Sequence, residues 1–191
     1  MWYVTGYRAE LHLHTAYSFL EGASQPEELA WTAANLGYRS LAVTDHDGLH
    51  GAMFFAQACK AYELRPITGV ELTLRHPLLQ RVHLTLLAES EQGYANLCRL
   101  ITEAHRKSPD PDDVALDPSE LEGRTGGVIV LTGCRGGEVS QLIDKPAEAL
   151  AAAGRLVDLF GRGNVYVELQ HNLVQGDTRR VGRLAELAAQ L

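Results

Sequence analysis

Short apolar runs alternate with amphipathic segments along the chain, and we interpret the former as strands and the latter as helices. The predicted strands cover residues 9–14, 39–45, 65–74, 81–89, 127–133 and 164–170. The predicted helices cover residues 24–37, 48–64, 91–106, 145–161 and 177–191. Because regular alternation of strand and helix is typical of a mainly parallel sheet, the pattern predicts an α/β fold whose sheet is either open or closed into a barrel.

Local signals refine this prediction. Ser24 is the expected N-cap of the first helix, and Glu27 completes a capping box. The third and fourth strands are so close that we expect a hairpin-like pair or an irregular crossover. Residues 107–127 are rich in Pro, Asp and Gly and predict a surface excursion with a short helix at 118–123. The chain ends on an amphipathic helix with no strand after it, so we expect a fragment of a longer protein.

The chain has 191 residues, of which 46% are hydrophobic, enough for one ordinary domain spanning 1–191. It contains no apolar run of about 18 residues, and its first ten residues lack the features of a signal peptide, so we expect a cytoplasmic protein without membrane contact. Three widely spaced cysteines argue against a disulfide framework. The net charge of −7 predicts little affinity of the isolated domain for DNA.

The first candidate chemistry is the pair His12 and His14, which point to the same face of a strand because side chains alternate along it. The motif alone is equally compatible with two surface histidines. The other strand units each contribute a metal-capable side chain as well. These side chains are Glu21 after the first strand, Asp45 and His46 after the second, Glu71 in the third, His83 in the fourth and Cys134 after the fifth.

Sites in parallel α/β folds form at the C-terminal ends of strands, so these residues are expected to converge at one rim. Imidazole, carboxylate and thiolate together favour zinc, with manganese or iron as alternatives, and so many ligands predict more than one ion. Two or three ions about 3.5–4 Å apart suit the hydrolysis of phosphomonoesters or phosphodiesters.

Five ordered segments carry a family resemblance: ELHLHTAYSFLEGAS, LAVTDHDGLHGA, PITGVEL, the run from HLTLLAES to GYANLCRLI, and VLTGCRGG. They resemble the PHP (polymerase and histidinol phosphatase) domain. The form is similar to the N-terminal domain of bacterial C-family DNA polymerases, the polymerase III alpha subunits, and especially to their error-prone type. The resemblance implies a distorted, TIM-like (β/α)7 barrel, here truncated before its last strand, with two to three divalent metal ions.

The resemblance also implies roles for individual residues. The metal ligands would be His12, His14, Glu21, His46, Glu71, His83 and Cys134, and Asp45 and His46 would take part in catalysis, with Asp45 orienting neighbouring ligands or handling a proton. The family usually has Asp where this chain has Glu21. The family's last two ligands form an Asp-x-His pair beyond the final helix, which this chain does not reach.

These roles imply a metal-dependent phosphoesterase, including a 3′–5′ exonuclease, acting on a DNA 3′ end or a nucleotide phosphate, with the remainder of the polymerase chain as partner. Two alternatives stay open: a catalytically silent module that supports the polymerase or docks a partner, and a free-standing phosphatase such as histidinol phosphatase. Arg179, Arg180 and Arg183 are expected to form only a solvated basic face.

Overall fold

The computed structural model describes residues 7–110 and 113–191. Residues 1–6, on which the prediction of no signal peptide partly rests, and residues 111–112 of the predicted excursion lie outside the described residues. The chain divides into two compact units, residues 1–70 and residues 71–191. No helix in the described ranges has both the length and the apolar character needed to cross a bilayer.

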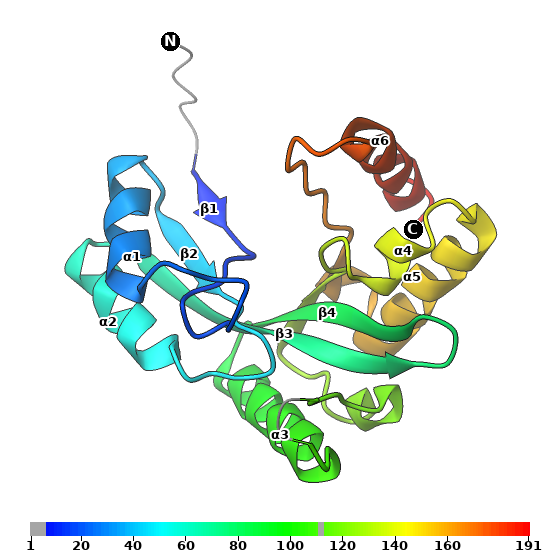
Figure 1. The fold of residues 1–191 in the computed structure, drawn as a ribbon, viewed down its shortest axis with the longest axis horizontal. Coiled ribbons are helices and arrows are strands. Elements are labelled where there is room, and N and C mark those ends of the chain that lie inside the picture. Colours follow the sequence, from blue (N-terminus) through cyan, green and yellow to red (C-terminus); the bar gives the residue numbers. More distant parts are fainter. Residues whose placement is uncertain (1–6, 111–112) are drawn as a thin grey trace. The chain divides into compact units, whose positions relative to one another are not determined.

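The first unit is a small parallel sheet covered by two helices (Figure 1). Strand β1 (Ala9–Glu10) pairs with β2 (Ser40–Val43), and β2 pairs in parallel with the first residues of β3 (Arg65–His76). Helices α1 (Pro26–Asn35) and α2 (Ala52–Ala61) contact each other. Their apolar faces and β2 form one core of buried side chains, which includes Ala30, Leu41, Val43, Phe55 and Cys59.

The start of α1 differs from the predicted one by a single residue. The N-cap is Gln25, and the carboxylate of Glu28 accepts a hydrogen bond from its backbone N–H at 2.9 Å. The predicted cap of Ser24 with Glu27 is therefore wrong. The reason is Pro26, whose fixed φ and missing N–H suit the first helical position and so set where the helix begins.

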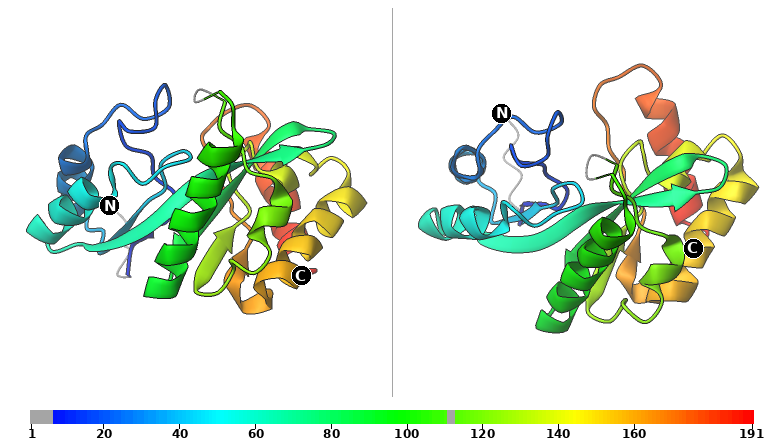
Figure 2. Two further views of the ribbon diagram at one scale, coloured as in Figure 1. Left: turned by 90° about the horizontal axis from the view of Figure 1, so that it is seen from below. Right: turned by 60° about the horizontal axis from the view of Figure 1, so that its bottom comes forward.

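The second unit continues the sheet with the rest of β3, β4 (Gln80–Ala88), β5 (Val128–Leu131) and β6 (Val165–Tyr166). Strands β3 and β4 are neighbours joined by the turn 77–79, which confirms the hairpin-like pair (Figure 2). Strand β4 is antiparallel to β5, whereas β5 and β6 are parallel. The sheet is thus less parallel than predicted, because so short a turn leaves no room for the crossover that a parallel pair needs.

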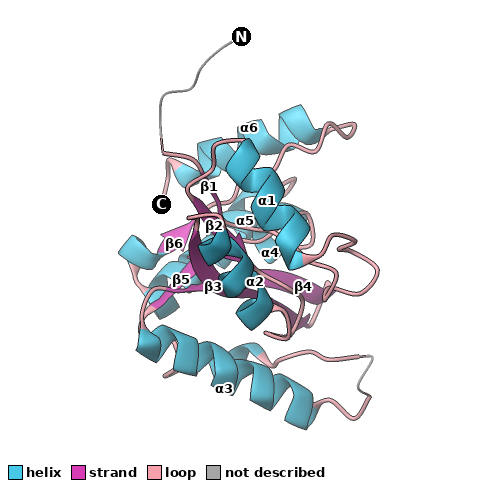
Figure 3. Cartoon of the chain, turned by 90° about the vertical axis from the view of Figure 1, so that its left-hand side faces the viewer, coloured by secondary structure: helices cyan, strands magenta, loops and turns pink. Residues whose placement is uncertain are grey.

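Helices flank the strands of this unit (Figure 3). They are α3 (Glu91–Lys107), α4 (Glu138–Gln141), α5 (Pro146–Phe160) and α6 (Asp177–Ala188), with 3₁₀ turns η1 (Pro118–Leu121) and η2 (Arg162–Asn164). Turn η1 matches the short helix predicted within the excursion. Buried side chains of α4, α5 and α6, among them Val139, Ala153 and Leu184, form a second core. Across both units the strand order is β1-β2-β3-β4-β5-β6, which gives the predicted α/β fold.

Candidate metal centre

In the first unit, His14, Glu21 and His46 offer ligand atoms that all lie within 4.8 Å of one another. We call these residues the first ligand group. His46 Nε2 lies 2.7 Å and His14 Nδ1 lies 3.6 Å from Glu21 Oε2. The imidazoles of His14 and His46 meet edge to face with ring centroids 4.7 Å apart. The carboxylate of Glu21 is half exposed, whereas both imidazoles are largely covered.

The H-x-H motif lies just beyond β1, because regular pairing ends at Glu10. Pairing continues in a modified form around Leu13. Its carbonyl accepts from the backbone N–H of Thr44 at 2.9 Å, and its own N–H donates to Thr44 Oγ1 at 2.9 Å. Leu13 packs against the core, so His12 and His14 flank it with their ring centroids 5.3 Å apart. The predicted strand over 9–14 is therefore shorter, but the two histidines remain neighbours.

Asp45 fixes the turn that separates His14 from Glu21. Its buried carboxylate accepts hydrogen bonds from the backbone N–H of Thr15 at 2.7 Å, from Thr15 Oγ1 at 2.8 Å and from Ser18 Oγ at 2.6 Å. Ser18 Oγ in turn accepts from the backbone N–H of His46 at 3.2 Å. These contacts hold the loop between His14 and Glu21, and the predicted roles of Asp45 in orienting ligands and in proton transfer both stay predictions.

A glycine closes the same loop. The backbone N–H of Ala16 donates to the carbonyl of Ser24 at 2.9 Å, which folds the segment back on itself. A Cβ on Gly22 would lie 1.9 Å from the carbonyl oxygen of Thr15, so only glycine fits there. Leu20, one residue before the ligand Glu21, has a φ of 69° and is fully exposed. Backbone contacts, and not the side chain of Leu20, therefore hold Glu21 in place.

In the second unit, Glu71, His83 and Cys134 form what we call the second ligand group. The distance from Glu71 Oε1 to His83 Nδ1 is 2.6 Å, and the distance from the same oxygen to Cys134 Sγ is 3.1 Å. Cys134 Sγ lies 3.4 Å from His83 Nδ1. The side chain of Glu71 is completely buried and that of His83 is 26% exposed.

The three residues come from three neighbouring strands or from the loop that follows one of them. Glu71 lies within β3, His83 within β4, and Cys134 follows β5. The loop after β5 comes very close to His83, because a Cβ on Gly136 would lie 2.8 Å from His83 Nδ1. The N–H of Gly136 donates to Cys134 Sγ at 3.3 Å, and the N–H of His83 donates to the carbonyl of Gly136 at 3.0 Å.

These contacts change the titration of His83 in the metal-free chain. Hydrogen bonds to Cys134 and then to Glu71 raise the pKa of His83 from 6.5 to about 10, although burial alone would lower it. The protonated imidazole thus occupies a place where positive charge is stabilised by a carboxylate and a thiol. A divalent cation would meet the same negative environment.

Each unit brings the predicted ligand-type residues that it contains close together. His12, His14, Glu21 and His46 lie near one another in the first unit, and Glu71, His83 and Cys134 do so in the second. Sequence reasoning missed Thr15 and Ser18, whose hydroxyl groups connect Asp45 to the loop. Their only signal was two hydroxyl residues between a histidine motif and an acidic residue, which is too common to single out.

Comparison with known proteins agrees with this arrangement of motifs. The family model "PHP domain" matches residues 10–172. The error-prone DNA polymerase of Mycobacterium tuberculosis (strain ATCC 25618 / H37Rv) is 42% identical over 189 residues, covering 94% of this chain and 17% of the relative. The error-prone DNA polymerase of Cutibacterium acnes is 42% identical over 197 residues, covering 95% of this chain and 17% of the relative. The chain thus spans about one sixth of the length of these relatives.

A solved structure supports the fold. An amidohydrolase from Chromobacterium violaceum matches with a TM-score of 0.61 at 17% identity, over 95% of this chain and 83% of that chain. The family match covers every residue of both ligand groups and most of the α/β fold. The chain belongs to the PHP domain family.

Proposed function

We propose that this chain is the PHP domain of an error-prone DNA polymerase and that its two ligand groups bind divalent metal ions for phosphoester hydrolysis. The observation that carries the proposal is that six of the seven predicted ligands form the two ligand groups and the seventh, His12, lies beside His14, in a PHP domain. The similarity to error-prone polymerases supports the first half, and the donor chemistry supports the second.

The donor sets suit a metal ion by their chemistry, and their ligand atoms lie close enough together to reach one ion. Ligand atoms around a zinc ion at about 2.0–2.3 Å lie roughly 3.3–3.7 Å from one another in a tetrahedral site. The separations of 3.6 Å between Glu21 and His14 and of 3.4 Å between Cys134 and His83 lie in this range. The separations of 2.7, 2.6 and 3.1 Å are hydrogen-bond distances, so these pairs would have to move apart by less than about 1 Å to hold an ion between them. Imidazoles with one carboxylate suit zinc, manganese or iron, and the thiol of Cys134 favours zinc in the second group.

Each group would hold its ion through residues whose positions are already fixed. A bound divalent ion polarises a phosphoryl oxygen and lowers the pKa of water. The chain itself supplies the geometry, because Asp45 and Ser18 hold the loop of Glu21, and Gly136 holds Cys134 and His83. We propose a phosphodiester such as a DNA 3′ end as the substrate class, with hydrolysis in the 3′–5′ direction.

The test combines metal content and hydrolysis on the 191-residue chain, purified without chelators or an affinity tag. We expect two or more equivalents of zinc, manganese or iron by inductively coupled plasma mass spectrometry. We also expect shortening of a 5′-labelled single-stranded oligonucleotide from its 3′ end. The double variant His12→Ala, His14→Ala should lose metal and activity, whereas His105→Ala, an exposed position on α3, should keep both.

The outcomes separate the two halves of the proposal. Retained metal without hydrolysis of the oligonucleotide or of p-nitrophenyl phosphate would reject the hydrolase and leave a metal-stabilised docking module. Absence of metal after incubation with zinc and with manganese would reject both. Global unfolding of the double variant, seen by circular dichroism, would show that the metal supports the fold instead of the reaction.

A further inference from the structure

A cavity of about 250 Å³ in the second unit is lined by four arginines in a chain whose net charge is −7. We call it the arginine pocket. Arg135 follows the ligand Cys134 directly, and the other three come from α6, whose N-cap Gly176 also lines the cavity. These three are Arg179, Arg180 and Arg183. Polar groups of Ser140 and Gln141 complete the wall.

Two carboxylates accompany the four guanidinium groups. Asp177 is buried, accepts from the backbone N–H groups of Asn172 at 2.8 Å and Val174 at 3.1 Å, and forms ion pairs with Arg180 at 3.0 Å and Arg135 at 3.3 Å. Asp177 is thereby shared between a loop and two cations. Its single charge leaves one of those two cations uncompensated.

Asp144 is the other carboxylate and is 77% exposed. It contacts both Arg179, at 3.6 Å, and Arg183. Exposed ion pairs of this kind contribute little to stability and exchange readily with other partners. The pocket as a whole therefore carries two positive charges more than its own carboxylates neutralise.

Arg180 is the most buried of the four arginines that line the pocket. Its side chain is only 12% exposed, so the predicted solvated face is wrong for this residue. Its guanidinium donates to the carbonyl of Gln170 at 3.1 Å, while its buried Nε finds no acceptor within the described part of the chain. Burial and then the neighbouring Arg135 lower the pKa of Arg180, whereas Asp177 and Cys134 oppose this shift.

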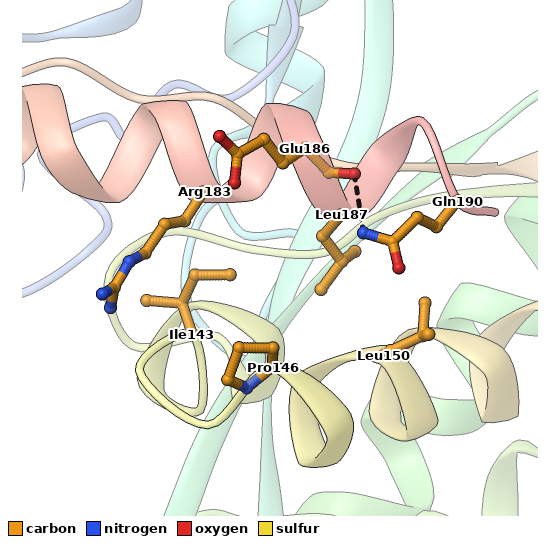
Figure 4. A pocket seen from close by; sticks show the side chains of 7 residues that line it. All are labelled: Ile143, Pro146, Leu150, Arg183, Glu186, Leu187 and Gln190. Atoms are coloured by element: carbon orange, nitrogen blue, oxygen red, sulfur yellow. Dashed lines mark hydrogen bonds between the residues drawn. The ribbon is translucent and has the colours of Figure 1, made fainter.

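Arg183 lines two cavities. Figure 4 shows it extending from α6 beside Ile143, at the rim of a smaller cavity also lined by Pro146, Leu150 and Leu187. Arg183 and Arg179 are the members of the pocket that can change partner, because their contacts involve the exposed Asp144 and not the buried Asp177.

We propose that the arginine pocket binds a phosphate group, so that the substrate class is one carrying a second phosphate beyond the reacting ester. Converging guanidinium groups suit phosphate because they donate several charge-assisted hydrogen bonds to its oxygens. Since water takes about 30 Å³ in the liquid, the cavity has room for a phosphate with ordered water. This proposal rests on the proposed function, and its phosphate could come from a nucleic-acid backbone or from free phosphate or pyrophosphate.

The test measures binding on the metal-depleted full chain, where hydrolysis plays no part. The probes are inorganic phosphate, pyrophosphate and a ten-nucleotide oligothymidylate without terminal phosphates. Binding is followed by the Nε–Hε signal of Arg180 in nitrogen-15 NMR spectra and, for the oligonucleotide, by fluorescence anisotropy. The variant Arg179→Gln, Arg183→Gln removes two pocket charges, and Arg155→Gln, Arg162→Gln removes two charges from positions that do not line the pocket.

We expect at least one probe to shift the Arg180 signal and the pocket variant to weaken its binding at least about fivefold, while the control variant stays within about twofold. For the oligonucleotide, the slope of log affinity against log salt should fall by about one for each lost contact. If the pocket variant weakens binding of the oligonucleotide only, the bound phosphate belongs to a nucleic-acid backbone. If it weakens binding of phosphate or pyrophosphate only, the ligand is the free ion.

No shift of Arg180 with any probe, or equal weakening by the two double variants, would overturn the proposal. Failure of the arginine pocket and failure of the proposed function give different results. Loss of hydrolysis with intact pocket binding rejects only the hydrolase, and intact hydrolysis without pocket binding rejects only the arginine pocket. Circular dichroism of both variants checks that the substitutions leave the fold unchanged.

Discussion

The two ligand groups use similar side chains but are built in different ways. The first group lies on loops, and its carboxylate, Glu21, is 51% exposed. The second group lies on β3, β4 and the start of the loop after β5, and its carboxylate, Glu71, is completely buried. A carboxylate stays charged in the protein interior only where charged or hydrogen-bonding partners replace the water that it has lost. The second group should therefore bind metal more tightly, and the first should exchange it more freely.

The largest effect should come from the two carboxylates. Glu71→Gln should weaken metal binding at the second group at least about 100-fold, since loss even of a residue that only supports a ligand costs 10- to 100-fold. Glu21→Gln should weaken the first group by only about tenfold, because water can replace an exposed carboxylate. Chelator competition with a metal indicator measures both affinities. Equal losses in the two variants would contradict the distinction between the groups.

Substitution at Asp45 tests the loop that supports the first group. Asp45→Asn should lower the free energy of unfolding by about 1.5–3 kcal/mol, because the bonds from Thr15 N–H and Ser18 lose their charge assistance and the amide NH2 cannot accept from Thr15 Oγ1. Metal affinity of the first group should fall about tenfold, with the second group unaffected. Urea unfolding and chelator competition give the two values. The milder variant Ser18→Ala should lower the free energy of unfolding by about 1 kcal/mol, and Asp158→Asn on α5 serves as the control.

If Asp45→Asn lowered the affinity of both groups equally, Asp45 would act on the whole fold and not on the loop of the first group.

The last prediction concerns pH. In the metal-free chain the pKa of His83 is raised from 6.5 to about 10, so the protonated imidazole stabilises the folded state fully below pH 6.5. This contribution is lost as pH rises through about 10. Urea midpoints measured on metal-depleted protein from pH 6 to 10 should therefore decrease. In His83→Gln this component of the decrease should be absent, and an unchanged slope would show that His83 titrates normally.

The sequence predicted much of the fold and the ligand types because both leave periodic or compositional signals. The hairpin of β3 and β4 followed from a short connection, and the ligands followed from polar residues at the ends of apolar runs. The sequence failed where a contact joins distant residues. The partners of Asp45 are 27 and 30 residues away, and Asp177 on α6 pairs with Arg135 in the loop after β5.

The prediction of where α1 starts was wrong for a local reason. Ser24 and Gln25 are each followed three positions later by a glutamate, so either could form a capping box. Only the position of Pro26 separates them. The sequence also could not assign the four arginines of the pocket, because a basic stripe on a helix is usually solvated and only tertiary packing covers Arg180.

The loop closed by Asp45 also has a consequence for sequence variation. Thr15, Ser18, Gly22 and Asp45 share hydrogen bonds or a backbone contact too close for a larger residue, so a change at one disturbs the others. Leu20 lies in the middle of the same loop and contributes almost no packing. In a library of variants selected for folding, these four positions should vary together or hardly at all, while position 20 should accept many residues and favour Gly and Asn.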